Sequence, residues 1–353
     1  MITTKEEISK IIKMRKILEN NYSLDEITNL DTFIRIKKDG LYIVINQNDI
    51  ILQLKLNLFD NNEDFSFTTK FGELLKIAKT FTKKTDINII INNNDITFEG
   101  NQDKDLVSEK IMVTKETKVN ISTNINGITI PSIDLLTGLI ACYKITKKME
   151  ILLEVDNQIK VSSKDGILKF ICNSNDTILS VNFDYKNTNN NFFLEKEKIR
   201  LIYSTIQESK ELDTELSTYQ GLVIKTGDFT LWAKKSNKNN FDVEGLINNL
   251  ENKLEFKKIE NSFIDEKNIN KRDIDERICY INDNKLTSDK MSSVFSDISI
   301  IKNGYSDKRI SELLKIKSLD LEELNLFIEN KYNILKVSND FLTYYILPQK
   351  KTN

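Results

Sequence analysis

The chain has 353 residues, and its 51 lysines and arginines nearly balance 53 aspartates and glutamates, which leaves a formal net charge of −2. A chain of this length is expected to fold as two or three domains rather than around one core. It contains no histidine, which excludes histidine-based acid–base catalysis, Ser-His-Asp and Cys-His triads and histidine metal sites. Any affinity for nucleic acid must come from segregated basic residues, because the net charge is close to zero.

The three cysteines, Cys142, Cys172 and Cys279, are far apart and form no CxxC pair. This spacing argues against a zinc site and a disulfide framework, and their apolar surroundings predict buried free thiols. The sequence has no P-loop and no carboxylate cluster with metal-ligand spacing, so we expect no enzymatic activity, no cofactor and no metal. Without a signal peptide or a long apolar run, the expected location is a bacterial or infected-host cytoplasm.

The first predicted helix spans residues 5–18. Its apolar face is predicted to comprise Ile8, Ile11, Ile12 and Leu18. The opposite face is predicted to carry Lys10, Lys13 and Lys16. A meander of three strands follows over residues 34–37, 41–46 and 50–56, with turns rich in Asn, Asp and Gly between them.

The most informative stretch, residues 71–100, reads as an amphipathic helix followed by a hairpin. The apolar positions of the helix recur with a period of 3.6 residues and are Phe71, Leu74, Leu75, Ala78 and Phe81. The opposite face is predicted to carry Lys76, Lys79 and Lys83. Two β-branched strands, 87–91 and 96–98, flank an Asn/Asp turn, and one more short strand is expected within 101–125.

A second block begins with a strand at 127–131 and a helix to about residue 147, for which Ser132 is the predicted N-cap. The buried face of this helix is predicted to comprise Leu135, Leu136, Leu139 and Tyr143. Its C-terminal end carries Lys144, Lys147 and Lys148. Strands are then predicted at 151–155, 158–162, 167–172 and 177–183. A helix over 194–208 follows, with Lys196, Lys198 and Arg200, and a hairpin over 222–233 closes the block.

The third block is less regular. Strands are predicted at 277–282, 285–288 and 294–301, while 251–276 is compatible with helix or loop. A last helix is predicted over 319–329, acidic through Asp320, Glu322, Glu323 and Glu329, and strands follow at 332–337 and 341–347. Helices that precede a closing hairpin therefore begin near Phe71, Leu194 and Leu319, about 123 and 125 residues apart. This spacing predicts three tandem domains, 1–126, 127–245 and 246–353, unless helix-plus-hairpin units recur by chance.

Five segments, in this order and spacing, resemble the bacterial DNA polymerase III β subunit, the sliding clamp. They are residues 65–68, 127–145, 161–170, 227–247 and 344–349. The resemblance covers essentially the whole chain and is weakest from about 251 to 310. Clamps commonly place His-Arg after the Asp-Gly turn of the middle domain, where this chain has Ile167-Leu168. Such departures suggest a divergent clamp, of the kind a phage or plasmid encodes.

The resemblance implies an α+β fold of three tandem clamp-type domains, each with two helices packed on antiparallel sheet, that form half of a ring. It implies a DNA sliding clamp, or processivity factor, that encircles double-stranded DNA without reading its sequence. A head-to-tail homodimer ring, tethering of a DNA polymerase and clamp loader through short linear motifs, and no contact with membranes are also implied.

Lysines that face duplex DNA bind phosphates through counterion release and read no bases, as a sliding protein requires. The candidate DNA-facing residues are Lys10, Lys13, Lys16, Lys76, Lys79, Lys83, Lys144, Lys147, Lys148, Lys196 and Arg200. For each of these, the alternative is an ordinary solvated lysine on a helix surface.

The family's second site is an apolar cleft that buries the Leu or Phe anchors of partner motifs. The matching positions here are Gly166, Ile167, Leu168, Leu246, Ile247, Tyr345, Ile346, Leu347 and Pro348. These residues could equally be core strand positions. Trp232 is interpreted as core or interface packing rather than as a platform for stacked bases.

Two other readings of the whole chain stay open. It could be a virion or tail structural protein built of tandem β-rich domains, whose lysines only face solvent. It could also be a replication accessory protein with the clamp fold that remains monomeric. The lysines on helices that recur every 120 residues or so favour the clamp, because a structural protein has no reason to keep them.

Overall fold

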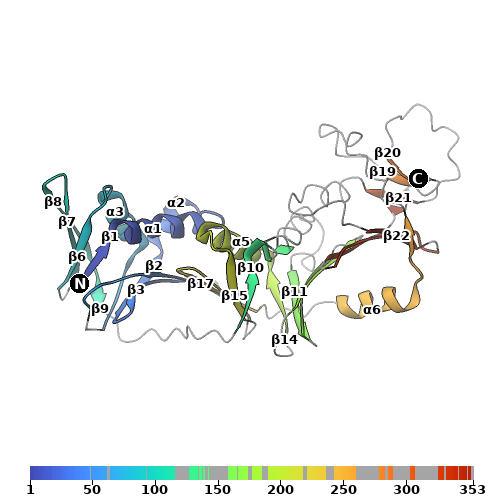
Figure 1. The fold of residues 1–353 in the computed structure, drawn as a ribbon, viewed down its shortest axis with the longest axis horizontal. Helices are drawn as coiled ribbons and strands as arrows, with labels where there is room; N and C mark the ends of the chain where they lie inside the picture. The colour runs from blue at the N-terminus through green and yellow to red at the C-terminus, as the bar shows by residue number, and fades with distance from the viewer. Residues whose placement is uncertain are drawn as a thin grey trace. The chain divides into compact units, whose positions relative to one another are not determined.

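The computed structural model divides into two compact units, each with its own sheets (Figure 1). Unit 1 comprises Met1–Leu136 and Glu197–Lys235, and unit 2 comprises Thr137–Lys196 and Ser236–Asn353. The structure describes residues 1–47, 49–61, 64–92, 94–115, 127–133, 135, 136, 138, 139, 142, 158–164, 166–173, 177–184, 190–217, 221–235, 242–259, 278–282, 285–288, 303–306, 325–329, 331–340, 342–347, 349 and 350.

Unit 1 is built on a nine-stranded antiparallel sheet. Its strands, in spatial order, are β10 (Ile128–Pro131), β15 (Asp213–Ser217), β16 (Gly221–Thr226), β17 (Phe229–Lys234), β4 (Ile50–Leu56), β3 (Gly40–Gln47), β2 (Asp31–Lys37), β5 (Phe65–Lys70) and β9 (Thr114–Lys115). Strands β17 and β4 join the two chain segments of the unit, with Leu231 opposite Leu52. The predicted meander and the hairpin at 222–233 are therefore neighbours in one sheet.

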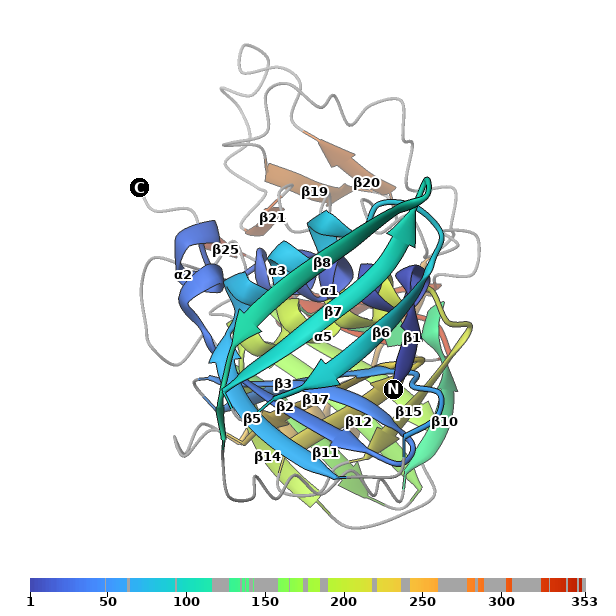
Figure 2. The same ribbon diagram turned by 90° about the vertical axis from the view of Figure 1, so that its left-hand side faces the viewer.

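A second antiparallel sheet of unit 1 faces the viewer in Figure 2, with α1 and α3 behind it. Its strands, in order, are β1 (Ile2–Thr4), β6 (Asp86–Ile91), β7 (Asp95–Gln102) and β8 (Asp105–Met112). The helices of unit 1 are α1 (Lys5–Leu18), α2 (Leu24–Asn29), α3 (Phe71–Thr80) and α5 (Lys196–Ser209). Strand β8 confirms the extra strand expected after residue 100.

Period-2 alternation explains why the nine-stranded sheet has one apolar face and one face that mixes polar and apolar residues. Ile43 lies opposite Leu54 and Ile34, and all three side chains are buried beneath the helices. The residues between them point to the other face, where Tyr42 lies opposite Lys55 and Arg35. Only the apolar face can bury helices, which places α1, α3 and α5 on one side of the sheet (Figure 1).

Helix α1 has the predicted bounds, and Thr4 caps it by accepting a hydrogen bond from the Glu7 amide at 3.4 Å. Its buried residues are Ile8, Ile11, Met14, Ile17 and Leu18. Ile12, which was predicted to share this face, is partly exposed because it is rotated by about 100° from Ile11. Helix α3 also begins where predicted, at Phe71, and ends at Thr80, so that Lys83 lies beyond it.

Unit 2 is built on an eight-stranded antiparallel sheet. Its strands, in order, are β14 (Asn190–Glu195), β11 (Gln158–Lys164), β12 (Ile167–Asn173), β13 (Thr177–Asp184), β24 (Leu342–Ile346), β23 (Ile334–Ser338), β22 (Asn325–Glu329) and β18 (Lys257–Ile259). A second sheet has the order β20 (Lys285–Ser288), β19 (Ile278–Asn282), β21 (Asn303–Ser306) and β25 (Gln349–Lys350). Helix α6 (Val243–Lys253) lies in the region between the predicted second and third blocks.

The prediction of a helix over 319–329 is wrong for residues 325–329. Residues 325–329 form β22, which pairs with β23 and β18, and residues 319–324 lie outside the described part of the chain. Glu329, predicted on an acidic helix face, is instead buried and accepts hydrogen bonds from the Lys331 and Tyr332 amides at 2.8 and 2.6 Å. Pairing with two strands outweighs the helical spacing of this short segment.

The helix predicted from Ser132 is helical at the described residues of its first part, where Leu135 and Leu139 are buried. The Ser132 hydroxyl is 2.9 Å from Thr214 Oγ1. Tyr143 and the strands predicted at 151–155 and 294–301 lie outside the described residues. Cys142 and Cys172 are buried and are not joined in a disulfide, as predicted. The α+β class with antiparallel sheets is confirmed, whereas the three domain boundaries remain a prediction.

Candidate DNA-facing helices and partner groove

Helices α1, α3 and α5 of unit 1 carry the first candidate surface. Lys16 on α1 lies 3.9 Å from the Glu208 carboxylate on α5, which places these two helices side by side. Beneath α5, the buried Lys198 ammonium donates to the Lys234 carbonyl of β17 at 3.0 Å. Lys198 therefore anchors α5 to the sheet and is not part of an outward-facing basic row.

Most of the described candidate cations do reach the outer side of these helices. Lys16, Lys76, Lys79, Lys83 and Arg200 are exposed, and Lys13 is partly exposed. Three of them have acidic neighbours: Lys16 is 3.9 Å from Glu208, Lys76 is 2.5 Å from Glu73, and Lys83 pairs with Asp103. Exposed pairs of this kind hold a lysine weakly, so its ammonium group stays available to another anion.

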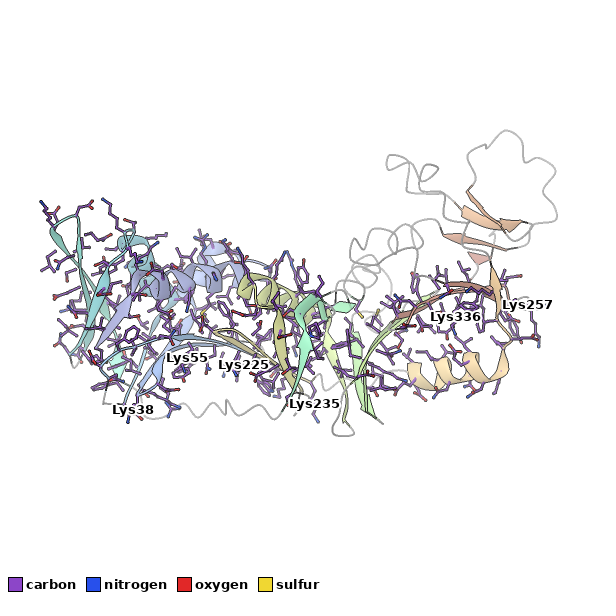
Figure 3. All side chains as sticks on the ribbon, in the orientation of Figure 1. Lys38, Lys55, Lys225, Lys235, Lys257 and Lys336 are labelled. Carbon is purple, nitrogen blue, oxygen red and sulfur yellow. The ribbon has the colours of Figure 1, made fainter. Side chains whose placement is uncertain are left out.

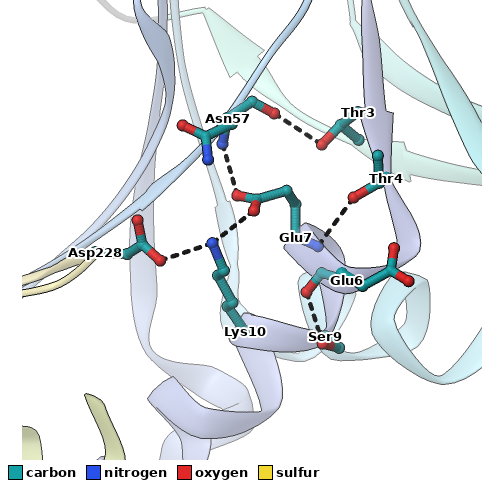
Figure 4. Close-up of polar contacts among 8 residues, drawn as sticks. All are labelled: Thr3, Thr4, Glu6, Glu7, Ser9, Lys10, Asn57 and Asp228. Carbon is teal, nitrogen blue, oxygen red and sulfur yellow. Dashed lines mark hydrogen bonds and ion pairs between the residues drawn. The ribbon is translucent and has the colours of Figure 1, made fainter. Parts of the chain in front are cut away.

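Lys10 does not belong to this outward set, contrary to the sequence-based expectation. Its ammonium group lies 2.6 Å from both Glu7 and Asp228, and Glu7 also accepts from the Asn57 amide at 2.7 Å (Figure 4). Burial lowers the pKa of Lys10, but the hydrogen bonds to Asp228 and Glu7 outweigh this and raise it above the ordinary value. Lys10 therefore ties α1 to the turn between β16 and β17.

The remaining candidate cations cannot be placed. Lys144, Lys147 and Lys148 lie outside the described residues, and Lys196 begins α5 but its side chain is not described. These four positions stay predictions.

The opposite face of the nine-stranded sheet is also basic, which the helix-based reasoning missed. Lys38, Lys55, Lys225 and Lys235 lie on this side in Figure 3. Lys55 is 3.3 Å from Asp39, and Lys225 is 2.8 Å from Glu215. The sequence did contain a signal for this basic face. Lys55 and Lys225 each lie between two buried residues of their strands, so alternation turns them to the opposite face. Trp232 also lies on this face, partly exposed and opposite Val223 and Ile51.

An apolar cluster in unit 2 forms the second candidate surface, here called the groove. Its buried floor comprises Ile171, Ile178, Ile334 and Tyr345 of the sheet, on which Val243 of α6 is buried. The partly buried residues packed against this floor are Leu246, Ile247, Leu250, Leu254, Phe256 and Leu347. The cluster thus unites one face of the eight-stranded sheet with α6 and the residues that follow it.

Four of the predicted cleft residues, Leu246, Ile247, Tyr345 and Leu347, come together in the groove. Gly166 and Ile167 are exposed at the turn that opens β12 and are not part of the cluster.

Two further predicted cleft residues lie on the other side of the sheet. Leu168 alternates with Ile167 along β12, and Ile346 alternates with Tyr345 along β24, so both point away from the groove and are fully buried. Pro348 lies outside the described residues.

Ion pairs hold both ends of α6 against the sheet at the groove. Near its start, Glu244 is 2.7 Å from Lys160, whose side chain is only 6% exposed. Burial raises the pKa of Glu244, but hydrogen bonds from Lys160 and Ser162 and the positive charge of Lys160 and Lys169 lower it overall. Sequence reasoning missed this pair because its members are 84 residues apart and neither lies in a motif.

Near the end of α6, Glu251 contacts both Lys336 Nζ, at 2.8 Å, and the Tyr345 hydroxyl. The Lys336 ammonium is also 5.5–5.8 Å from the ring centres of Phe256, Phe327 and Tyr345. Such distances allow cation–π attraction. Lys336 thus joins β23 to α6 and to the aromatic residue that follows it.

Among the described residues, no group of three or more Cys, Asp or Glu side chains could hold a metal ion. Within the same part of the chain, no helix is long and apolar enough to cross a membrane.

The antiparallel sheets join distant chain segments and carry helices on the nine-stranded and eight-stranded sheets, which is an α+β fold. Solved structures of the DNA polymerase III β subunit, the bacterial sliding clamp, share this fold, and the structural similarity spans 99% of this chain. The β subunit of Pseudomonas aeruginosa matches with a TM-score of 0.66 and 12% sequence identity over 100% of its length. Those of Thermotoga maritima and Borrelia burgdorferi match with TM-scores of 0.64 and 0.65, at 12% and 14% identity, over 100% and 98% of their lengths.

The sequence itself matches no protein-family model and no curated protein. At such low identity the structural similarity shows the fold, and the function has to be argued from the residues of this chain.

Proposed function

We propose that the chain is a DNA sliding clamp, a non-enzymatic processivity factor that encircles duplex DNA and tethers a polymerase and other partners. The observation that carries the proposal is the outward basic surface on the helices of a clamp-type fold. Its described members are Lys13, Lys16, Lys76, Lys79, Lys83 and Arg200. Lys144, Lys147, Lys148 and Lys196 complete the proposed DNA-facing set.

The chemistry of this surface suits sliding rather than fixed binding. Exposed lysines contact phosphates as point charges through flexible side chains and make no base contacts that would favour one position on the DNA. The ion pairs of Lys76 and Lys83 with acidic neighbours weaken the attraction without abolishing it. A protein that must move along DNA needs this weak, sequence-independent attraction.

The groove in unit 2 is the proposed docking site for short motifs of a polymerase and clamp loader. The apolar residues that its sheet strands contribute suit burial of one or two apolar anchors, from which such motifs draw most of their affinity. Of the residues expected from the sequence, we retain Tyr345 and Leu347 as part of the docking surface, and Leu246 and Ile247 as residues of the helix that covers it.

The proposed assembly is a head-to-tail homodimer ring, which is testable by sedimentation. We expect analytical ultracentrifugation at micromolar concentration to show a species of twice the 41.0 kDa chain mass. A purely monomeric species under these conditions would contradict a stable two-chain ring and favour the monomeric accessory protein. Open-ended polymers that do not bind DNA would favour the virion structural protein.

A further inference from the structure

Helix α6 packs on its sheet much more loosely than the helices of unit 1. Of its 11 residues only Val243 is buried, whereas α1 buries five of its 14. Its other apolar residues, Leu246, Ile247 and Leu250, remain partly exposed above the groove floor. A helix with one fully buried and three partly buried apolar side chains gains less hydrophobic stabilisation than α1, because that gain scales with the apolar area removed from water.

The sheet beneath α6 is complete without it. Strands β12, β13, β24 and β23 are hydrogen-bonded to one another in an unbroken ladder, to which α6 contributes no strand. The opposite face of these strands carries its own buried core, which includes Phe170, Val181 and Tyr344. Removing α6 would therefore uncover the groove floor but leave the backbone pairing of the sheet intact.

The contacts that hold α6 are of the kind a bound peptide makes. Glu251 supplies a carboxylate to Lys336 and Tyr345, and Phe256 supplies an aromatic ring beside the same two residues, 5.9 Å from the Tyr345 ring centre. Leu250 and Leu254 supply apolar anchors. Any peptide with apolar or aromatic anchors and a nearby carboxylate could reproduce this set.

We propose that α6 and the residues up to Phe256 are a built-in, displaceable occupant of the groove, with which partner motifs compete. This inference rests on the proposed docking role of the groove. A covalently attached segment competes at an effective concentration in the millimolar range, so it weakens every external motif. The groove would thus accept only partners that bind strongly enough to displace α6, which selects against weak, unspecific peptides.

The test compares two substitutions at neighbouring positions of α6. Leu250→Glu places a charge on the face over the groove, and Asn249→Glu places the same charge on the exposed side. We expect Leu250→Glu to abolish hydrogen-exchange protection in α6 while β12, β13 and β24 stay protected. Asn249→Glu should leave all protection unchanged. Loss of protection in these strands as well would make α6 an integral part of the core and overturn the proposal.

The second readout uses a fluorescent peptide of residues 242–259 as the probe. We expect the Leu250→Glu chain to bind it at least about tenfold more tightly than the unmodified and Asn249→Glu chains, because its groove is vacant. Equal binding by all three chains, or no binding by the Leu250→Glu chain, would overturn the proposal. Neither readout requires DNA or a ring, so this failure is distinguishable from failure of the proposed clamp function.

Discussion

Reversing the charge of Lys13, Lys16 and Lys79 to Glu is expected to reduce affinity for duplex DNA by about 10- to 100-fold and to flatten its salt dependence. Each lysine lies on α1 or α3, where Lys16 and Lys79 are exposed and Lys13 is partly exposed. The 3.9 Å contact of Lys16 with Glu208 is weak enough to leave its ammonium group available to phosphate. Each lost phosphate contact removes about one unit from the slope of log affinity against log salt. Fluorescence anisotropy between about 50 and 200 mM salt measures both quantities.

The matched control reverses Lys38, Lys225 and Lys235, which lie on the opposite face of the same sheet (Figure 3). Both triple variants change the net charge equally, so any difference between them reports position rather than charge. We expect the control to lose less than about threefold in affinity, since only long-range, screened repulsion remains. Equal losses in the two variants would contradict a DNA-facing helix surface.

Replacing Glu244 by Gln is expected to destabilise unit 2 by about 2–3 kcal/mol, which is less than for a fully buried ion pair because the Glu244 side chain is 26% exposed. The substitution leaves the Lys160 ammonium, which is nearly inaccessible to water, without its partner carboxylate. Native-state hydrogen exchange at β11 and β12 measures the loss. Glu215→Gln is the matched control: its partner Lys225 is 44% exposed, so we expect less than about 1 kcal/mol.

The same pair predicts a pH dependence. The folded-state pKa of Glu244 is lowered, so its contribution to stability is complete above the unfolded-state value of about 4.3 and is lost as the pH falls through the folded value. The difference in stability between the unmodified chain and Glu244→Gln should therefore be constant near neutral pH and shrink below about pH 4. A difference that persists undiminished at pH 3 would show that the carboxylate charge is not its cause.

The periodicity of apolar residues was sufficient to predict those helices and strands that bury one regular face. The spacing of apolar residues predicted α1 and α3 with their first residues, and alternation predicted β3, β4 and β6. Helix α2 was missed although Ser23 and Glu26 form a capping box, a four-residue signal that the sequence displays. Residues 325–329 were misread because their helical spacing is real, whereas their strand pairs with the adjacent β23 and also with β18, which lies far away in the sequence.

The candidate sites were predictable only in part for a related reason. The position of a lysine on a helix indicates which way its side chain points but not which residue it pairs with. The ion pair between Lys10 and Asp228 could therefore not be predicted from local sequence. In the groove, consecutive strand residues were assigned to one site, although alternation sends Leu168 and Ile346 to the opposite face. The covering of the groove by α6 depends on contacts of Glu251 with Lys336, which no local pattern encodes.

Topological retention on DNA tests the central claim most directly. The chain is allowed to thread onto linear duplex DNA with biotinylated ends, streptavidin is added to block both ends, and the mixture is passed over a sizing column in moderate salt. A ring should stay with the blocked DNA and be released when a restriction enzyme cuts the DNA between the blocks. Elution that does not depend on blocking or cutting would contradict encirclement, because a protein bound only by charge has no means of sensing distant DNA ends.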